Sequence, residues 1–306
     1  MIPEPEKSNR MLDLHTHSTA SDGTLTPAEM VRQAVAAGLT AVALTDHDTL
    51  AGLTEFMAAG ANAAVETVPG VEIACSWYGR SLHLVGLFVQ ADNQPLRRLL
   101  EKVRDHREKR NLAMLAKLAD AGLPLTYDEV RRTAGGKVIG RPHFAAALVA
   151  RGYCRTAEEA FARYIGRGAA AYVRRYLPLP TEALKALHDA GGVAVWAHPC
   201  GGSQDCTLSR LRQIGRHLRK HGLDGIEAFY SDHSRPQQEM LLQLAAELQL
   251  LPSGGSDFHG DNMPGVSLGY GRDRNLDVPD AWLSALRRRS HDRSARLPLN
   301  DGGDDG

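Results

Sequence analysis

Residues 11–48 read MLDLHTHSTASDGTLTPAEMVRQAVAAGLTAVALTDHD, and they decide the class of fold. An apolar run of strand length opens the stretch, and a second apolar run, LTAVAL, comes shortly before its end. Between the two runs, Thr26 and Pro27 begin a helical pattern as N-cap and first helical residue, and Gly38 ends it. This order of strand, helix and strand predicts parallel strands joined by covering helices, and therefore an α/β protein.

Histidines and carboxylates recur where the predicted strands stop or nearly stop. The runs are MLDLHTH at 11–17, AVALTDHD at 41–48, VPGVEI at 68–73, SLHLVGLFV at 81–89, GVAVWAHP at 192–199 and LPSGGSDFH at 251–259. A barrel of parallel strands gathers such positions onto one face. We therefore expect a shared metal site, and with it a hydrolytic enzyme.

The first of these runs ends in an H-x-H pair, His15 and His17. Residues i and i+2 of an extended segment point to the same side, so both imidazoles can reach one metal ion. Asp22 follows in the loop STASDG, where Gly23 permits a tight turn. Carboxylates complete sites for hard or borderline divalent metals, so Asp22 is a further candidate ligand.

The other candidate ligands lie on later runs. His47 follows AVAL, and we expect Asp46 and Asp48 on either side to orient it rather than to bind metal. Glu72 ends a predicted buried strand, where a carboxylate is costly unless it is paired or bound to metal. The nine candidate ligands are His15, His17, Asp22, His47, Glu72, His83, His198, Asp257 and His259.

Nine ligands exceed what one ion uses, so we expect two or three divalent ions that share bridging carboxylates. A set of imidazoles and carboxylates without thiolate favours manganese, iron or zinc in a reactive site over a structural zinc. Clustered cations acidify water into a nucleophile and offset the negative charge that builds on a phosphoryl oxygen. The set therefore predicts phosphoester hydrolysis.

Residues 101–175 interrupt the α/β rhythm with several predicted helices. They hold 16 Lys and Arg against 8 Asp and Glu, whereas the rest of the chain holds 20 against 28. A basic segment on an acidic body predicts a surface that receives phosphate groups, with a solvated helical face as the alternative. We interpret the segment as an inserted helical subdomain that forms a lid over the substrate, between barrel segments 11–100 and 176–286.

Arg141 and His143 are the candidate phosphate ligands of this insert. The motif GRPHF places both at a helix start, with Pro142 as the opening residue. A helix N-terminus with cationic side chains is a natural phosphate site, and a capping or surface role is the alternative. For Arg107 and Arg110, on the long helix before this motif, we expect a solvated face.

The remaining histidines and the cysteines carry weaker signals. His233 follows another predicted strand and could face the same site as the ligands. The four cysteines form no C-x-x-C pair, and we expect reduced, unpaired thiols, including Cys200 and Cys206 beside a glycine-rich loop. The histidines expected on helices or in the tail, with structural or solvated roles, are His188, His217, His221 and His291.

The two ends of the chain, 1–10 and 287–306, are low in apolar content, and we expect both to be flexible. The N-terminus lacks the apolar core of a signal peptide, and no run approaches the roughly 18 apolar residues that a membrane span needs. We therefore expect a cytoplasmic protein that makes no membrane contact. Nothing in the sequence indicates an obligate protein partner.

The motifs LHTHSTASDG, LTDHDTL, GVEI, LHLVG, GRPHFA, AHP and GSDFH together resemble those of the PHP (polymerase and histidinol phosphatase) family. The resemblance covers most of the chain and implies a distorted TIM-like (β/α)7 barrel with up to three metal ions, often manganese. It implies that His15, His17, Glu72 and Asp257 hold one ion, that Asp22, His47 and His259 hold a second, and that the bridging Glu72 holds a third with His83 and His198. It also implies that Arg141 and His143 grip a substrate phosphate.

The insert resembles that of the small stand-alone branch of the family, which includes 3',5'-nucleotide bisphosphate phosphatases and 5'-to-3' exoribonucleases. We therefore expect removal of the 3'-phosphate from nucleoside 3',5'-bisphosphates such as 3'-phosphoadenosine 5'-phosphate, with Asp257, His198 and His233 as catalytic residues. The alternatives are a 5'-to-3' exonuclease on short RNA or DNA, a histidinol phosphate phosphatase, and a non-catalytic metal-binding module. The expected partner is a small phosphorylated nucleotide or a short oligonucleotide.

Overall fold

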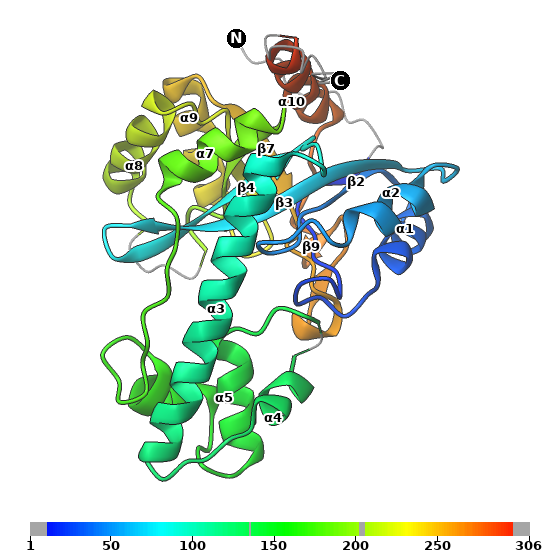
Figure 1. The fold of residues 1–306 in the computed structure, drawn as a ribbon. Helices are drawn as coiled ribbons and strands as arrows, with labels where there is room; N and C mark the ends of the chain where they lie inside the picture. The colour runs from blue at the N-terminus through cyan, green and yellow to red at the C-terminus, as the bar shows by residue number, and fades with distance from the viewer. Residues whose placement is uncertain (1–10, 135, 202–205, 296–306) are drawn as a thin grey trace, which may run out of the picture.

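A seven-stranded sheet forms the centre of the protein in the computed structural model, which describes residues 11–134, 136–201 and 206–295 (Figure 1). The strands follow one another in chain order: β1 Met11–Asp13, β2 Leu39–Leu44, β3 Glu66–Trp77, β4 Arg80–Leu87, β5 Val193–Ala197, β6 Gly225–Tyr230 and β7 Leu251–Gly255. The chain just after β1 bonds to β7 and to the residues that follow it: the Leu14 amide donates to the Gly254 carbonyl at 3.2 Å, and the His17 amide donates to the Phe258 carbonyl at 2.9 Å. The sheet is therefore a nearly closed barrel, which confirms the predicted α/β class and architecture.

Helices cover the outside of this barrel, and strand alternation explains how. On β2, Val42 and Leu44 pack outward in one cluster with Met30, while Ala41 and Ala43 pack in a second cluster inside the barrel. The small alanines fit the narrow interior. The covering helices are α1 Pro27–Ala36, α2 Leu53–Gly60, α7 Pro180–Asp189, α8 Leu208–Lys220 and α9 Arg235–Leu248.

A final helix, α10 (Asp280–Ser294), lies at the opposite end of the barrel from the inserted helices (Figure 1). Its residues Leu283 and Leu286 join the cluster inside the barrel, beside Leu12 of β1. The expected flexible tail from residue 287 is therefore wrong for 287–294, whereas 296–306 and 1–10 lie outside the described residues. The basic run looked like a solvated tail because its partner, the buried Asp224, is distant in sequence.

The contacts between α10 and Asp224 predict a stability effect. Arg293 donates to both carboxylate oxygens of Asp224 at 2.9 and 3.0 Å, and Asp224 is 2% exposed. Because hydrogen bonds to charged groups contribute about 1.5–3 kcal/mol, we expect Arg293→Ala to lower the free energy of unfolding by about 2 kcal/mol. Denaturant unfolding measures this, with Arg288→Ala as the control on the same helix. Equal stability of the two variants would contradict the pairing.

Strand β4 departs from the parallel order that we expected. It runs antiparallel to both β3 and β5, because only Tyr78 and Gly79 connect β3 to β4. Both residues have positive φ, 42° and 76°, as a tight hairpin turn requires, whereas a parallel crossover needs a dozen or more residues. The reversal brings His83, near the start of β4, to the edge where the parallel strands end.

The helices between β4 and β5 other than α7 form the inserted part: α3 Gln94–Asp120, α4 Tyr127–Arg132, α5 Arg141–Ala150, α6 Ala157–Ala160 and the π-helical turn Phe161–Ile165. Helix α3 runs from the barrel to the lower end of Figure 1, where α4 and α5 lie. Helix α3 crosses the expected boundary at residue 100. Its Leu96 and Leu100 pack in the barrel's outer cluster, while its Met114 and Leu118 pack in a separate cluster with residues of α4 and α5. The insert therefore has an apolar core of its own, and α3 ties it to the barrel.

Among the described residues, no helix combines the length and apolar content that crossing a bilayer would need.

Candidate metal centre

The nine candidate ligands come together at one end of the barrel. Most of them follow the ends of β1, β2, β5 and β7, and Glu72 and His83 come from the paired strands β3 and β4. Two of them, His198 and Asp257, have positive φ angles of 29° and 56°, a conformation that is uncommon for non-glycine residues and that also occurs at turns. The fold therefore brings together on one edge all nine side chains that the sequence singled out.

Glu72 lies at the centre of the group and is fully buried. Its Oε1 is 2.7 Å from His83 Nδ1 and 2.9 Å from His198 Nε2. Its Oε2 is 2.9 Å from His47 Nδ1, 3.2 Å from His17 Nε2 and 3.3 Å from His15 Nε2. The two oxygens thus face two different sets of imidazoles, which is the arrangement of a bridging carboxylate.

The other two carboxylates lie on either side of His17. Asp257 Oδ1 is 3.0 Å from His17 Nε2 and 3.5 Å from His15 Nε2. Asp22 Oδ1 is 3.4 Å from His259 Nε2, and its Oδ2 is 3.8 Å from His47 Nε2. The rings of His17 and His259 stack with centroids 4.1 Å apart. Asp257 and Asp22 therefore belong to two different groups of converging donor atoms, and both groups contain His17. The group of Asp22 also contains His47, which lies against Glu72.

Unsatisfied polar atoms show that these residues fit metal ions. His15 Nε2, His17 Nε2, Asp22 Oδ1, Glu72 Oε2 and Asp257 Oδ1 are buried and have no hydrogen-bond partner. Together with the other candidate ligands, these residues form three groups, and within each group one ligand atom of every residue lies within 4.8 Å of the others. The groups are His15, His17, Glu72 and Asp257; His17, Asp22, His47 and His259; and His47, Glu72 and His83. Leaving buried polar atoms unpaired is costly, and divalent ions would satisfy them together.

The electrostatics favour the ionised form of the carboxylates. Burial opposes ionisation of Glu72, but the neighbouring His47, His83 and His15 outweigh it and hold the Glu72 pKa well below its usual range. Burial is likewise outweighed at Asp257, where His15 and His259 hold the pKa below its ordinary value. Metal ligands must be deprotonated, and the carboxylates meet this condition at neutral pH. The same contacts raise the pKa of His15, His17, His47 and His198 against the effect of burial, so these imidazoles would release protons when ions bind.

Asp46 and Asp48, which we expected to orient His47, hold neighbouring segments instead. Asp46 accepts hydrogen bonds from the Ser18 amide at 2.8 Å and from the Ser18 hydroxyl at 2.7 Å, and so anchors the loop that leads to Asp22. Asp48 pairs with Arg107 of α3. Because Asp46 and Asp48 are neighbours of His47 in the sequence, we expected them to contact it. Their partners are instead Ser18 and Arg107, which only the fold brings close to them.

Glu227 is a functional residue that the sequence interpretation missed. It lies on β6, is 3% exposed, and accepts a hydrogen bond from His15 Nδ1 at 3.0 Å and from the His198 amide at 2.6 Å. A carboxylate in the apolar run GIEAFY is the same signal that singled out Glu72. Glu227 therefore fixes which ring nitrogen of His15 faces Glu72 and Asp257.

Replacing this carboxylate tests its role. In Glu227→Gln, the amide cannot accept both hydrogen bonds with equal strength, so His15 and His198 lose their orientation. Such supporting partners are worth about 10–100-fold in metal affinity or activity, and we expect a loss in that range. Metal titration monitored by calorimetry measures it, with Glu239→Gln on the exposed face of α9 as the control. Unchanged metal affinity in Glu227→Gln would contradict the role.

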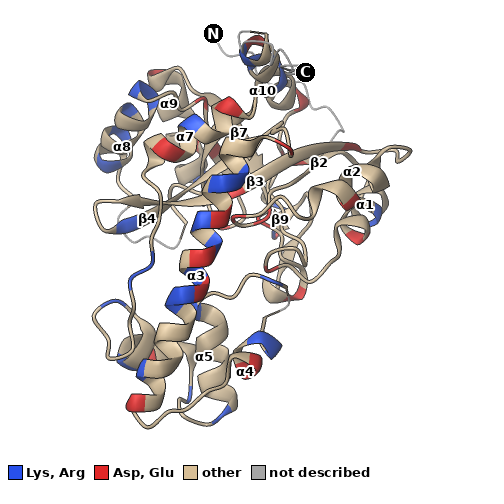
Figure 2. Cartoon of the chain, viewed as in Figure 1, with Lys and Arg blue, Asp and Glu red and all other residues tan. Residues whose placement is uncertain are grey.

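A cavity of about 820 Å³ joins this group to the insert. Its wall includes Asp22, His47 and His83, and also Arg141 at the start of α5. The other arginines that line it are Arg80, Arg107, Arg110, Arg167, Arg174 and Arg175. Two of these arginines, Arg107 and Arg110, lie on α3, along which basic and acidic residues alternate (Figure 2).

The two arginines of α3 contradict the expected solvated face. Arg110 is 6% exposed and the Arg107 side chain 13% exposed, and both line the cavity. His143 lies beside it, where its Nδ1 accepts a hydrogen bond from the Gly140 amide at 3.0 Å and so caps α5. Burial lowers the pKa of His143. The sequence pattern failed for Arg107 and Arg110 because the covering segment, residues 172–177, is far away in the chain.

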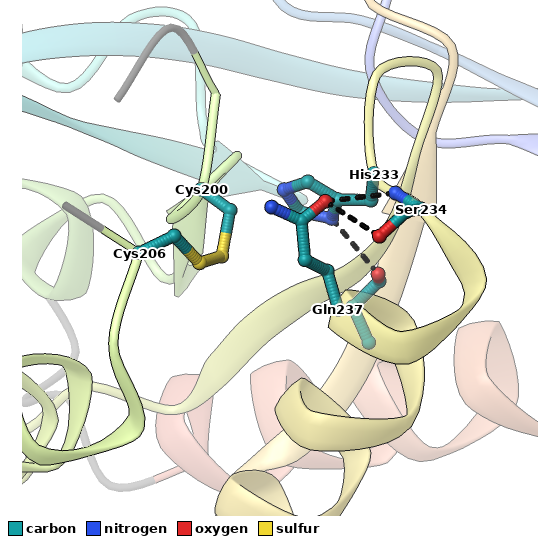
Figure 3. Close-up of a disulfide and its surroundings, with 6 residues drawn as sticks. Cys200, Cys206, His233, Ser234 and Gln237 are labelled. Carbon is teal, nitrogen blue, oxygen red and sulfur yellow. Dashed lines mark hydrogen bonds between the residues drawn. A yellow bond between two sulfur atoms is a disulfide. The ribbon is translucent and has the colours of Figure 1, made fainter. Parts of the chain in front are cut away.

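His233 is close to the group but separated from it by Tyr230. The His233 ring is 5.0 Å from the Tyr230 ring, which in turn is 5.3 Å from the His198 ring. His233 Nδ1 donates to the Ala228 carbonyl at 3.0 Å, and burial lowers its pKa (Figure 3). The Tyr230 hydroxyl donates to Asp257 Oδ2 at 3.3 Å. His233 thus lies next to the residue that supports Asp257.

Figure 3 also shows that Cys200 and Cys206 form a disulfide, with Cα atoms 5.1 Å apart. The expectation of unpaired thiols is therefore wrong for these two residues and holds for Cys75 and Cys154. The bend after His198 and Pro199 brings the two cysteines within bridging distance, which spacing alone did not reveal. The disulfide joins Cys200, two residues after His198, to Cys206, two residues before the start of α8.

Comparison with known proteins decides the family. The model of the PHP domain matches residues 13–166. The chain belongs to the PHP domain family. This confirms the resemblance that the motifs suggested, and with it the interpretation of the chain as a phosphoric ester hydrolase of this family.

Three relatives of this PHP-domain protein illustrate the range of the family. A 5'-3' exoribonuclease of Haemophilus influenzae is 38% identical over 89% of this chain and 96% of its own. A 3',5'-nucleoside bisphosphate phosphatase of Chromobacterium violaceum is 34% identical over 86% and 92% of the two chains. The crystal structure described as a putative metal-dependent phosphoesterase from Bifidobacterium adolescentis superposes with a TM-score of 0.79, at 33% identity over 94% and 98% of the chains.

Proposed function

We propose that this phosphoesterase removes the 3'-phosphate from nucleoside 3',5'-bisphosphates, giving the 5'-monophosphate and inorganic phosphate. One observation carries the proposal: the candidate metal ligands and a cluster of arginines line the same cavity. A substrate with two phosphates can place one at the metal ligands and the other among the arginines. The cavity volume of about 820 Å³ lies in the range of small-molecule sites.

We propose a ligand set that follows the three groups of donor atoms. One ion is held by His15, His17, Glu72 and Asp257, a second by Asp22, His47 and His259, and a third by Glu72, His83 and His198. The distances from Glu72 Oε1 to His83 and His198 support the third set. Imidazoles with carboxylates suit manganese, and iron or zinc are the alternatives.

Divalent ions held there would activate water and offset charge on the phosphoryl oxygens. The protein's own residues position the reactants. Asp257 presents Oδ1 to His15 and His17 while Tyr230 holds its Oδ2, and His198 Nε2 lies 2.9 Å from Glu72 Oε1. Arg141 binds a phosphate oxygen, and His143 shapes the start of α5. We assign Asp257 and His198 to the catalytic group, and His233 supports them through Tyr230.

A 5'-to-3' exonuclease is the second candidate, because a relative with 38% identity carries that name. Both reactions break the bond between phosphorus and the 3' oxygen of a nucleotide that carries a 5'-phosphate, so one site can serve either. An exonuclease also needs aromatic platforms for successive bases. The aromatic residues that line the cavity are Tyr172 and Tyr176, beside seven arginines. Histidinol phosphate fits less well, because its cationic amine would enter this cluster of positive charges.

A direct comparison of substrates tests the proposal. Purified protein loaded with manganese is given adenosine 3',5'-bisphosphate and, separately, a 5'-phosphorylated oligoribonucleotide. Release of inorganic phosphate from the bisphosphate at the higher kcat/KM supports the phosphatase. A higher kcat/KM for stepwise mononucleotide release from the oligonucleotide would replace it with the exonuclease, and no hydrolysis of either substrate would refute both.

A further inference from the structure

A second cavity, of about 550 Å³, also reaches the candidate metal ligands. Its wall includes His83 and His198, which both face Oε1 of Glu72, at 2.7 and 2.9 Å. We call it the tryptophan cavity, after Trp77 and Trp196 in its wall, and we call the cavity of about 820 Å³ described above the arginine cavity. His83 lines both, so the two cavities meet at the metal ligands.

The hairpin of β3 and β4 belongs to the walls of both cavities. On β3, Ser76 lines the arginine cavity and Trp77 lines the tryptophan cavity, because successive side chains of a strand point to opposite faces. At the start of β4, Arg80 and Ser81 line both cavities. A ligand that extends from one cavity into the other therefore lies along this hairpin, next to His83.

Aromatic and cationic side chains line the tryptophan cavity together. Trp77 is half-buried, and the rings of Tyr78 and His217 meet it in T-shaped contacts, with centroids 5.0 and 4.8 Å away, so that no described ring stacks flat on it. Arg80 and Arg210 also line the cavity, and none of the described residues in its wall is acidic. Rings beside cations are the features by which proteins bind single-stranded nucleic acid, because bases stack on the rings and phosphates pair with the cations.

The surface next to the tryptophan cavity has the same character. Tyr78, at the tip of the hairpin, is 89% exposed. Helix α8 lies next to the hairpin, which it contacts through His217 (Figure 1). This helix, LSRLRQIGRHLRK, contains five Arg and Lys residues and no acidic residue. The surroundings of the cavity therefore also favour a polyanion with aromatic groups.

We propose that the tryptophan cavity binds the second nucleoside of a 5'-phosphorylated dinucleotide, so that the enzyme also hydrolyses this phosphodiester. The inference goes beyond the proposed function, which concerns a phosphate monoester, and it rests on the same placement of the 5'-phosphate in the arginine cavity. The scissile phosphate lies at the metal ligands, where the two cavities meet, and the second base stacks on Trp77. A volume of about 550 Å³ is in the range of small-molecule sites.

The reaction with the dinucleotide is the same as that with the bisphosphate. Water adds to the phosphorus, the bond from phosphorus to the 3' oxygen of the first nucleoside breaks, and that oxygen takes up a proton. The phosphate stays on the second nucleoside as its 5'-phosphate, so the products are two nucleoside 5'-monophosphates. With the bisphosphate, the tryptophan cavity holds no part of the substrate, and inorganic phosphate is the second product.

The first experiment compares three substrates of the manganese-loaded enzyme: adenosine 3',5'-bisphosphate, its 3'-methyl phosphodiester, and a 5'-phosphorylated adenylyl dinucleotide. Trp77→Leu keeps an apolar side chain but removes the ring. We expect it to lower kcat/KM for the dinucleotide at least about tenfold, within the range for stacking one base, and for the other two by less than about threefold. Trp77→Phe restores a ring and is expected to recover most of the loss. Trp282→Leu, at a half-buried tryptophan that lines neither cavity, is the matched control.

The second experiment measures binding without catalysis. The protein is treated with a chelator, and its tryptophan fluorescence is followed as the dinucleotide or adenosine 5'-monophosphate is added. A base that stacks on Trp77 quenches its emission, so we expect the dinucleotide to quench the wild type and Trp282→Leu more strongly than the mononucleotide does. We expect this difference to disappear in Trp77→Leu. Circular dichroism checks that each variant is folded.

The outcomes separate this inference from the proposed function. An equal loss of kcat/KM for all three substrates in Trp77→Leu, no loss for any of them, or quenching that persists in this variant would overturn the site. Hydrolysis of the bisphosphate but not of the dinucleotide would overturn the further activity alone. Hydrolysis of the dinucleotide that depends on Trp77, without phosphate release from the bisphosphate, would support the site and refute the proposed function. No hydrolysis of either substrate would refute both activities.

Discussion

Glu72→Gln is expected to abolish phosphoesterase activity and to lower the metal content of the protein. The substitution keeps the size of the side chain but replaces one acceptor oxygen by an amide, which cannot bridge two sets of imidazoles. Loss of a supporting partner costs about 10–100-fold, and loss of a shared ligand affects two ions, so we expect activity to fall by at least about 1,000-fold. Elemental analysis of the purified variant and initial rates with saturating manganese measure both effects.

Glu101→Gln, on the exposed face of α3, is the control for this substitution and is expected to behave as wild type. Stability measured by thermal unfolding separates loss of metal from loss of fold. A folded Glu72→Gln variant with wild-type metal content and activity would contradict the central position that the distances assign to this carboxylate.

Asp257→Asn is expected to lower turnover far more than it weakens substrate binding. Asp257 faces His15 and His17, and its other oxygen accepts the hydrogen bond from Tyr230. Because it contacts the metal ligands rather than the arginines, we expect kcat to fall by about 100-fold or more while KM changes by less than about threefold. Steady-state kinetics with the bisphosphate substrate measure the two parameters separately.

The exposed Asp277 provides a matched Asp→Asn control in the same part of the chain. Metal content must be checked in the same samples, because a ligand variant can lose its ions. Turnover at the wild-type rate in Asp257→Asn, with metals fully loaded, would refute the catalytic assignment.

That the candidate ligands would lie together could be predicted from the sequence, because the relevant signals are local. A histidine directly after a strand, as at His15 and His198, occupies a place that the barrel topology alone brings to one edge. Glu72 stood out because a carboxylate in an apolar run needs a partner. The same criterion, applied to Glu227, would have found the residue that orients His15.

The arginine cluster could not be predicted, because it depends on how the insert folds over the barrel. Arg110 and Arg175 are 65 residues apart in the sequence, and Asp48, which holds Arg175 and Arg107, belongs to a third segment. Judged from its sequence neighbours alone, each of these arginines looks like an exposed basic residue. The sequence does not predict the antiparallel β4 either, because Tyr78 and Gly79 differ from the Asn-Gly, Asp-Gly or Gly-Gly pairs that mark a two-residue hairpin turn.

A crystal structure of the manganese-loaded protein, with anomalous diffraction at the manganese edge, tests the central claim most directly. We predict two or three anomalous peaks within the group of nine ligands, with Glu72 bound to at least two of the ions. Peaks that lie elsewhere in the protein, or a single ion that does not touch Glu72, would contradict the account.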